Sequence, residues 1–230
     1  MKRKGFAVYA GIREYHEILN LQRRVHSARR NNTIPDIVFF LEHYPCITIG
    51  AEGNRDHILA GSELLRCLGI DVYETDRGGD VTYHGPGQLV CYPIIDLRNY
   101  GCDVLAYARA LEEMVIRTIR TFGIPSGRRK NRPGVWVGEN RKIAAQGISV
   151  AGWITMHGIS LNVSPAMQHY SMIIPCGLTD SSVTSMEECL GQAIGMSRVI
   201  DEMSYNFTRL FDLDLDEIRE ENIPCIFDYA

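Results

Sequence analysis

The feature that most constrains this sequence is a glycine-rich segment that runs directly into an apolar strand. Residues 77–88, RGGDVTYHGPGQ, hold four glycines in twelve positions, and residues 89–95 are apolar. The paired Gly78 and Gly79 let the backbone approach a ligand closely, because glycine tolerates positive φ that a β-carbon forbids. The segment lacks the spacing of both phosphate-binding glycine motifs. It predicts a contact loop, with two ordinary tight turns as the alternative.

Strand-like and helix-like patterns alternate irregularly along the rest of the chain. Residues 6–9, 37–41 and 134–163 read as β-structure, and residues 37–41 are apolar throughout, as at the centre of a sheet. A helix is predicted between the first two strands. A second begins after the N-cap Asp103, carries apolar residues from Leu105 to Phe122 at helical spacing, and stops at Gly123. Two more helices are expected to begin near Ser182 and Ser197.

The absence of repeats and long linkers favours one domain. We expect residues 1–230 to form a single α+β domain, with a mixed β-sheet flanked by helices.

Charge, hydropathy and cysteine spacing exclude several classes of protein. The formal net charge of −4 gives no attraction of the whole protein to nucleic acid or to membranes. No apolar run reaches the roughly 18 residues of a membrane span, and the N-terminus does not read as a secretory signal or presequence. Seven cysteines without a C-x-x-C pair argue against a disulfide framework and a zinc ribbon. We therefore expect a cytoplasmic protein with no metal site, no nucleic-acid partner and no membrane contact.

Two further segments carry residues suited to chemistry. In residues 141–147, RKIAAQG, strand alternation directs Lys142 to the face opposite Ile143, and the small residues that follow leave room beside it. In residues 174–178, proline restrains the backbone before Cys176, and the glycine after it lets an acyl group approach the main chain. Taken singly, a solvated lysine and a buried, inert cysteine are the commoner cases.

Together, and in this order, the segments resemble the octanoyltransferases of lipoate biosynthesis. The resemblance rests on R-G-G-x-V-T-Y-H-G-P-G-Q-L, on K-I-A-x-x-G-I about sixty residues later, and on H-G-I-S-L-N-V and I-P-C-G-L. It covers residues 39–185. It implies the fold of biotin and lipoate protein ligases. It also implies transfer of an octanoyl or lipoyl group from acyl carrier protein to a specific lysine of a lipoyl domain, through a cysteine thioester, as the first step of protein lipoylation.

The resemblance also implies roles for individual residues. Cys176 matches the acyl-thioester nucleophile, and Lys142 matches the lysine that lowers its pKa and moves protons. The residues that match the acyl-binding segments are Arg77, Gly78, Gly79, Asp80, Val81, Thr82, Tyr83, His84, Ala145, Gln146, Gly147, Gly158, Ile159 and Ser160. Asp80 stands at a position that the family leaves variable, so no separate role is expected for it.

Thioester exchange suits this pair of side chains. An unperturbed thiol has a pKa of about 8.5 and is only a few per cent ionised at neutral pH, whereas a nearby ammonium stabilises the thiolate. Lysine can also give up its proton, so Lys142 can act as the base for an incoming amine. Exchanging one thioester for another needs no ATP. We expect no cofactor beyond the phosphopantetheine of acyl carrier protein, which supplies the acyl group.

The pocket lining and two histidines are open at this stage. Val81, Tyr83 and Ile159 are expected to line an apolar slot for the octanoyl chain. His84 and His157 each follow a β-patterned segment and precede a glycine, so both are expected at the border of the pocket. Each either orients a loop through hydrogen bonds or serves as the base instead of lysine.

Local charge bears on the partners. Residues 117–142 contain eight basic residues and one acidic residue, and a basic rim would attract acidic acyl carrier protein. The same rim would attract the lipoyl domains of 2-oxoacid dehydrogenase complexes and the H protein of glycine cleavage. A solvated loop is the alternative. After residue 200 the chain has nine acidic and two basic residues, for which a solvated helix face is expected.

Two other functions stay open. An ATP-dependent lipoate-protein ligase shares the fold and a similar lysine but needs no nucleophilic cysteine. The cysteine between Pro175 and Gly177 and the form of the glycine-rich segment argue against it. A noncatalytic module that binds lipoyl domains would not need a reactive Cys176.

Overall fold

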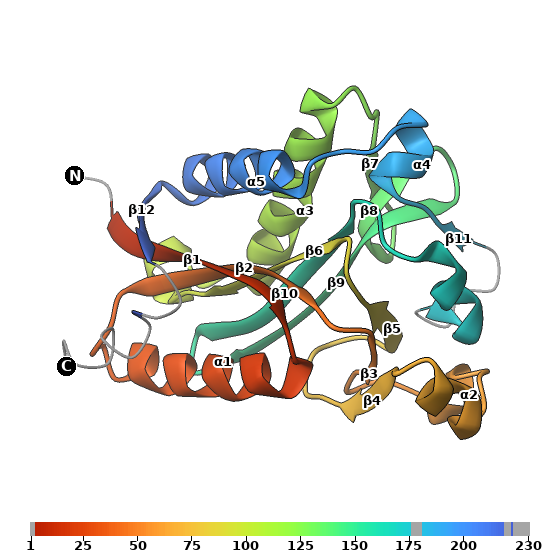
Figure 1. The fold of residues 1–230 in the computed structure, drawn as a ribbon. Helices are drawn as coiled ribbons and strands as arrows, with labels where there is room; N and C mark the ends of the chain where they lie inside the picture. The colour runs from red at the N-terminus through yellow and green to blue at the C-terminus, as the bar shows by residue number, and fades with distance from the viewer. Residues whose placement is uncertain (1–2, 176–180, 219–221, 223–230) are drawn as a thin grey trace.

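A mixed β-sheet lies at the centre of the molecule (Figure 1). The computed structural model describes residues 3–175, 181–218 and 222. Within this part of the chain the sheet has the order β12-β1-β2-β6-β10-β9-β8-β7, and β11 pairs with β9. Its strands are β1 (Arg3–Arg13), β2 (Asp36–His43), β6 (Gln88–Ile94), β7 (Gly127–Arg129), β8 (Arg132–Val137), β9 (Arg141–Ala151), β10 (Ile154–Asn162), β11 (Ser182–Val183) and β12 (Leu213–Ile218).

Helices cover both faces of this sheet. In Figure 1, α3 and α5 lie on one face and α1 lies on the other. The helices are α1 (Tyr15–Arg30), α2 (Ser62–Cys67), α3 (Val104–Thr121), α4 (Met186–Leu190) and α5 (Met196–Phe211), with short 3-10 turns at η1 (Arg55–His57), η2 (Leu97–Tyr100) and η3 (Met167–Met172). The predicted arrangement, α+β with helices flanking a mixed sheet, is confirmed.

Strand β2 shows why an unbroken apolar segment belongs at the sheet centre. Val38 and Phe40 enter the core beneath α3 and α5, whereas Ile37, Phe39 and Leu41 enter the core beneath α1. Successive side chains of a strand point to opposite faces, so a strand covered on both sides must be apolar at every position. The sequence prediction for residues 37–41 is confirmed.

A second, smaller sheet carries the glycine-rich segment. Strand β3 (Cys46–Ile49) lies between β4 (Asp71–Glu74) and β5 (Val81–His84). One face of this sheet encloses its own apolar core, to which Ile47, Tyr170 and Ile173 contribute. The glycine-rich segment leaves β4, turns through residues 75–80 and enters β5, so it lies at the junction of the two sheets.

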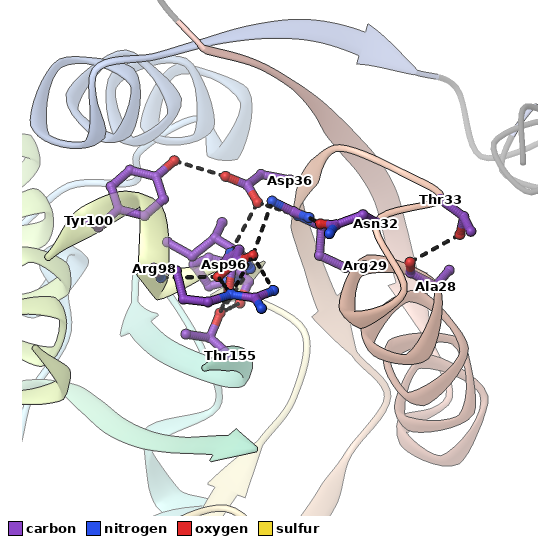
Figure 2. A network of polar contacts seen from close by, with 11 residues as sticks. Ala28, Arg29, Asn32, Thr33, Asp36, Asp96, Arg98, Tyr100 and Thr155 are labelled. Carbon is purple, nitrogen blue, oxygen red and sulfur yellow. Dashed lines mark hydrogen bonds and ion pairs between the residues drawn. The ribbon is translucent and has the colours of Figure 1, made fainter. Parts of the chain in front are cut away.

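A buried ionic cluster joins α1, β2 and the connection from β6 to α3 (Figure 2). The Nε of Arg29 donates to Oδ1 of Asp36 at 2.7 Å, and the hydroxyl of Tyr100 donates to Oδ2 of Asp36 at 2.9 Å. Asp96 pairs with Arg98 at 2.7 Å, and the hydrogen bond from Arg98 keeps the pKa of the Asp96 carboxyl below its usual value. The cluster lies against the ends of β2 and β6 and fixes α1 on the sheet.

Helix boundaries agree with the sequence in most places. The Asp103 side chain accepts from the N–H of Ala106 at 2.9 Å, which confirms the predicted N-cap of α3. Gly123 lies just past the helix with φ +84°. Leu105 was expected on the apolar face, but it is 62% exposed and borders an open groove between α3 and the hairpin of β7 and β8.

The helix expected near Ser182 begins later. Ser182 and Val183 form β11 beside β9, and α4 starts at Met186 after the N-cap Ser185. The expectation of a helix start at Ser182 is therefore wrong, because these residues pair with the start of β9, beyond the part of β9 that pairs with β10. Helix α5 begins at Met196, one residue from the expected Ser197.

Candidate functional site

The glycine-rich segment is fixed by backbone hydrogen bonds to two neighbours. The N–H of Ala51 donates to the carbonyl of Arg77 at 2.9 Å, and the N–H of Gly78 donates to the carbonyl of Ile148 on β9 at 2.9 Å. Gly79 has φ +83°. A β-carbon on Gly147 would lie 2.7 Å from the carbonyl oxygen of Gly78, so the segment and β9 approach more closely than any side chain allows. The close approach that the glycines permit is thus made to β9, and contact of the loop with a ligand stays a prediction.

The buried guanidinium of Arg77 organises the same turn. Its Nη2 donates to the carbonyl oxygens of Thr48 and Asp80, both at 2.7 Å, and its Nε donates to Oγ1 of Thr48 at 3.0 Å. Only 7% of Arg77 is exposed. A charged donor on several carbonyls is stronger than a neutral one, so Arg77 ties β3 to the start of β5.

A cavity opens where this turn meets β6, β9 and β10. Its walls bound about 430 Å³ of space, part of which is open to solvent. The residues along it are Arg77, Gly79, Asp80, Thr82, His84, Val90, Tyr92, Ala145, Gln146, Gly147, His157, Gly158, Ile159 and Ser160. The structure thus brings together residues from all three segments that the sequence singled out as acyl-binding.

The expected apolar lining is partly wrong. Ile159 lies along the cavity, although its side chain packs in the core beneath α3 with that of Cys91 on β6. Val81 and Tyr83, however, point into the core of the small sheet, and it is Thr82 and His84 of the same strand that face the cavity. Strand alternation sends neighbouring side chains to opposite faces, and here the apolar pair belongs to the core. Val90 and Tyr92 supply apolar wall instead, and the sequence analysis missed them.

Lys142 lies at the start of β9 and is almost fully buried, with 6% of its surface exposed. Its Nζ lies 4.9 Å from the ring centroid of Trp136 on β8, a cation–π contact. Ile143 enters the core beneath α3, so Lys142 faces the opposite side of β9, as predicted.

The chain returns to Lys142 soon after the predicted nucleophile. Val183 of β11 pairs with Lys142 in parallel register, and the N–H of Thr184 donates to the Lys142 carbonyl at 2.9 Å. Before the nucleophile, the N–H of Ile174 donates to the carbonyl of His57 at 2.8 Å. Cys176 itself lies outside the residues that the structure describes.

Comparison with known proteins shows which family this chain belongs to. A family model described as the lipoyl protein ligase A/B catalytic domain matches residues 14–208. An octanoyltransferase from Solibacter usitatus is 45% identical over 202 residues, which cover 88% of this chain and 90% of that protein. An octanoyltransferase from Caldicellulosiruptor bescii is 43% identical over 217 residues, which cover 94% of this chain and 95% of that protein.

The chain belongs to the lipoyl protein ligase A/B catalytic family. The fold agrees: a solved structure of lipoate-protein ligase A bound with ATP matches with a TM-score of 0.72 over 99% of this chain and 95% of that chain, at 16% identity. The resemblance to octanoyltransferases is thus confirmed, and the chain is a transferase of the octanoyl and lipoyl class. In the part of the chain that the structure describes, none of the helices is long and apolar enough to span a membrane.

His84 of this family member is buried beside the cavity as a neutral imidazole. Burial, and then the nearby His43, hold its pKa well below its ordinary value. Its Nδ1–H donates to Oε1 of Gln88 at 2.6 Å, because an amide oxygen can only accept, and Gln88 in turn donates to Oδ1 of Asn162 at 3.0 Å. Asn162 donates to the carbonyl of Thr184 at 3.0 Å. A chain of hydrogen bonds therefore runs from the cavity wall to the residue after β11, which fits the orienting role.

His157 is held by two elements. Burial lowers its pKa, although the hydrogen bond and charge of Asp76 act in the other direction. The neutral ring donates from Nε2 to Oδ1 of Asp76 at 3.0 Å, and its backbone N–H donates to Oε1 of Gln22 on α1 at 2.9 Å. Its φ of +56° is unusual for a residue with a β-carbon. These contacts also match an orienting role.

A pair that the sequence analysis missed lies at the rim. Oδ2 of Asp80 meets Nδ1 of His57 at 2.5 Å, and Oδ1 of Asp80 accepts from the N–H of Asn54 at 2.9 Å. Asp80, for which no separate role was expected, therefore fastens the turn at η1 to the glycine-rich segment. No spacing signal in the sequence links the two, because they meet only through tertiary structure.

Proposed function

We propose that this chain, as a single catalytic domain over residues 1–230, transfers an octanoyl or lipoyl group from acyl carrier protein to a specific lysine of a lipoyl domain. Cys176 carries the acyl group as a thioester, and Lys142 is its proton partner. The acceptors are the lipoyl domains of 2-oxoacid dehydrogenase complexes and the H protein of glycine cleavage. The phosphopantetheine of the donor supplies the acyl group, with no further cofactor, and the reaction takes place in the cytoplasm.

The observation that carries this proposal is the position of the two chain ends around Cys176. On one side, Val183 pairs with Lys142. On the other side, Ile174 is bound to His57, which contacts Asp80 at the cavity rim. The chain thus leaves the rim and reaches Lys142 within a few residues. This supports a thiol placed between the acyl cavity and the lysine.

The surroundings suit the acyl chain. Val90 and Tyr92 give the cavity an apolar wall, and the small side chain of Ala145 leaves room for a methylene chain beside the backbone. Gly158 has a packing role here, because a β-carbon on it would collide with the Cys91 carbonyl oxygen of β6. A slot of this kind binds an aliphatic group through burial of apolar surface, at about 0.8 kcal/mol for each CH₂. We assign the acyl-binding role to the residues along this cavity.

In the proposed reaction, Lys142 gives up a proton in the first half-reaction and takes one back in the second. The Cys176 thiolate attacks the thioester carbonyl carbon of the donor, the carbon–sulfur bond to pantetheine breaks, and the Lys142 ammonium protonates the departing sulfur. The acceptor lysine, as a neutral amine, then attacks the new thioester. Its extra proton passes to neutral Lys142, and the Cys176 thiolate leaves paired with the lysine ammonium. The breaking of the second thioester drives amide formation without ATP.

Intact-protein mass spectrometry tests this proposal. After incubation with octanoyl acyl carrier protein, the wild type gains one octanoyl group, Cys176→Ala gains none, and Lys142→Ala gains it more slowly while keeping its fold by circular dichroism. The exposed Cys67 offers a matched control, since Cys67→Ala is expected to react like the wild type. An octanoyl adduct on Cys176→Ala would refute the nucleophile.

The same assay separates the alternatives. Transfer of free octanoate or lipoate that depends on ATP would indicate a ligase. Binding of lipoyl domains with no acyl transfer, and with a Cys176 that iodoacetamide does not modify near neutral pH, would indicate a noncatalytic module.

A further inference from the structure

A groove lined by basic side chains lies beside the acyl cavity. It runs between the first half of α3 and the hairpin of β7 and β8, and it bounds about 1,220 Å³ of space open to solvent. The cations along it are Arg109 of α3 and Arg128, Arg129, Lys130 and Arg132 of the hairpin. The four hairpin cations are half of the eight basic residues in 117–142, and the fold gathers them on one surface with Arg109.

The acidic residues near this basic groove are already engaged. Glu112 accepts from Nε of Arg128 at 3.0 Å and from the N–H of Gly134 at 2.9 Å, and Glu113 also pairs with Arg128 at 2.9 Å. These contacts hold the hairpin against α3. Arg109, Arg129 and Lys130 pair with no carboxylate among the described residues. Their charges therefore add to a positive potential that the carboxylates of the described residues do not neutralise.

The basic groove and the acyl cavity share a lining residue. Gln146 of β9 lines both, and its Nε2 donates to the carbonyl of Ala108 on α3 at 2.9 Å. The guanidinium of Arg129 lies 5.3 Å from the ring centroid of Trp136, the ring that Lys142 also contacts. Since neighbouring strands are about 4.8 Å apart, the hairpin cations lie roughly 5–10 Å across the sheet from β9.

We propose that the basic groove is the docking surface for the acidic acyl carrier protein, and that its arginines bind the phosphodiester of the pantetheine arm. This inference rests on the proposed function. A thioester whose acyl end fills the cavity leads its arm out past Gln146 into the groove. Guanidinium groups match phosphate oxygens in geometry and charge. The donor carries such a phosphodiester and the acceptor lysine does not, so the charge in the groove favours the donor.

An exposed apolar side chain completes the surface. Leu105 borders the groove and is 62% exposed, which is unusual for a leucine beside so many charges. Protein interfaces commonly combine a small apolar contact with a polar rim. Leu105 gives the docked partner such a contact at the start of α3.

Charge reversal tests the docking surface. The double variant Arg109→Glu, Lys130→Glu changes two exposed side chains outside the acyl cavity. We expect its KM for octanoyl acyl carrier protein to rise about tenfold relative to its KM for the neutral thioester octanoyl-pantetheine, because rim charges act mainly on encounter. The double variant Arg66→Glu, Arg120→Glu has the same change in net charge at exposed sites off the groove, and its KM ratio is expected to stay at the wild-type value.

The outcomes separate this inference from the proposed function. An unchanged KM ratio in the groove variant, an equal rise in the control variant, or a rise in KM for the lipoyl domain alone would each overturn donor docking. Failure of the wild type to transfer octanoyl from either thioester would instead overturn the proposed function. Should the double glutamate variant fold poorly by thermal melting, Arg109→Gln, Lys130→Gln tests the same point with a smaller expected rise.

Discussion

The close approach of the glycine-rich segment to β9 is tested by adding one methyl group at Gly147. A β-carbon there would lie 2.7 Å from the carbonyl oxygen of Gly78 and 3.0 Å from Cδ of Arg77. The oxygen belongs to the backbone, so the segment itself has to retreat by several tenths of an ångström. The hydrogen bond from the N–H of Gly78 to the carbonyl of Ile148 restrains it from retreating freely.

The magnitude follows from these contacts. Overpacking of this kind costs about 1–3 kcal/mol, and a strained or lost hydrogen bond adds about 1 kcal/mol. We expect Gly147→Ala to lower the free energy of unfolding by about 2–4 kcal/mol. Because Gly79 and Asp80 line the cavity, the same displacement enlarges it at the acyl site. A loss of 1.4 kcal/mol in acyl binding corresponds to a tenfold change, so kcat/KM should fall by about tenfold or more.

Two assays and one control variant test the prediction for Gly147→Ala. Urea denaturation measures stability, and transfer from an octanoyl thioester measures kcat/KM. Gly195→Ala is the matched control, because a β-carbon there has no neighbour within 4 Å and its φ of −67° suits alanine. As Gly195 is the N-cap of α5, a small loss of stability is expected there without loss of activity. If Gly147→Ala keeps both wild-type values, the close approach does not shape the cavity.

The remaining predictions concern stability. Asp36→Ala removes the carboxylate that accepts hydrogen bonds from Arg29, Tyr100 and the N–H of Asp96 in the cluster of Figure 2, and it deprives the buried Arg29 guanidinium of its carboxylate partner at 2.7 Å. We expect the free energy of unfolding measured in urea to fall by about 3–5 kcal/mol. A fall below about 1 kcal/mol would contradict this account. Burial lowers the pKa of His43 to about 4, so the native state binds fewer protons than the unfolded state below pH 6.5. The contribution of His43 to the free energy of unfolding is therefore complete above pH 6.5 and declines as the pH falls toward 4. Between pH 6.5 and 5 this group alone should cost about 2 kcal/mol, and His43→Gln should show a correspondingly flatter decline in denaturation midpoints measured at several pH values.

Periodicity predicted the parts of the fold that a single segment determines. The apolar strand β2, the capped start of α3 and the position of Lys142 opposite Ile143 each follow from residues close together in sequence. In each case local propensity and burial favour the same structure. These elements could therefore be predicted from the sequence alone.

The side chains that line the cavity could not be predicted in this way. Val81 and Tyr83 are apolar and adjacent to the glycines, so they were expected in the acyl slot. Their strand belongs to a second sheet with a core of its own, and that core takes the apolar side chains. Only the pairing of β3 with β5 tells which face is which. The contact of His57 with Asp80 was missed for the same reason, since 23 residues separate them.

A bulge in β9 explains how one strand serves both the core and the site. Ile143 and Ala144 are consecutive, yet both enter the core beneath α3, and the register with β8 shifts between Val135 and Trp136 at this point. In an unbroken strand, Lys142 would share the face of Ala144. The extra residue turns Lys142 to the other face, the one from which Gly147 meets the glycine-rich segment. The predicted proton partner and the acyl cavity therefore share one face of β9 because of this irregularity.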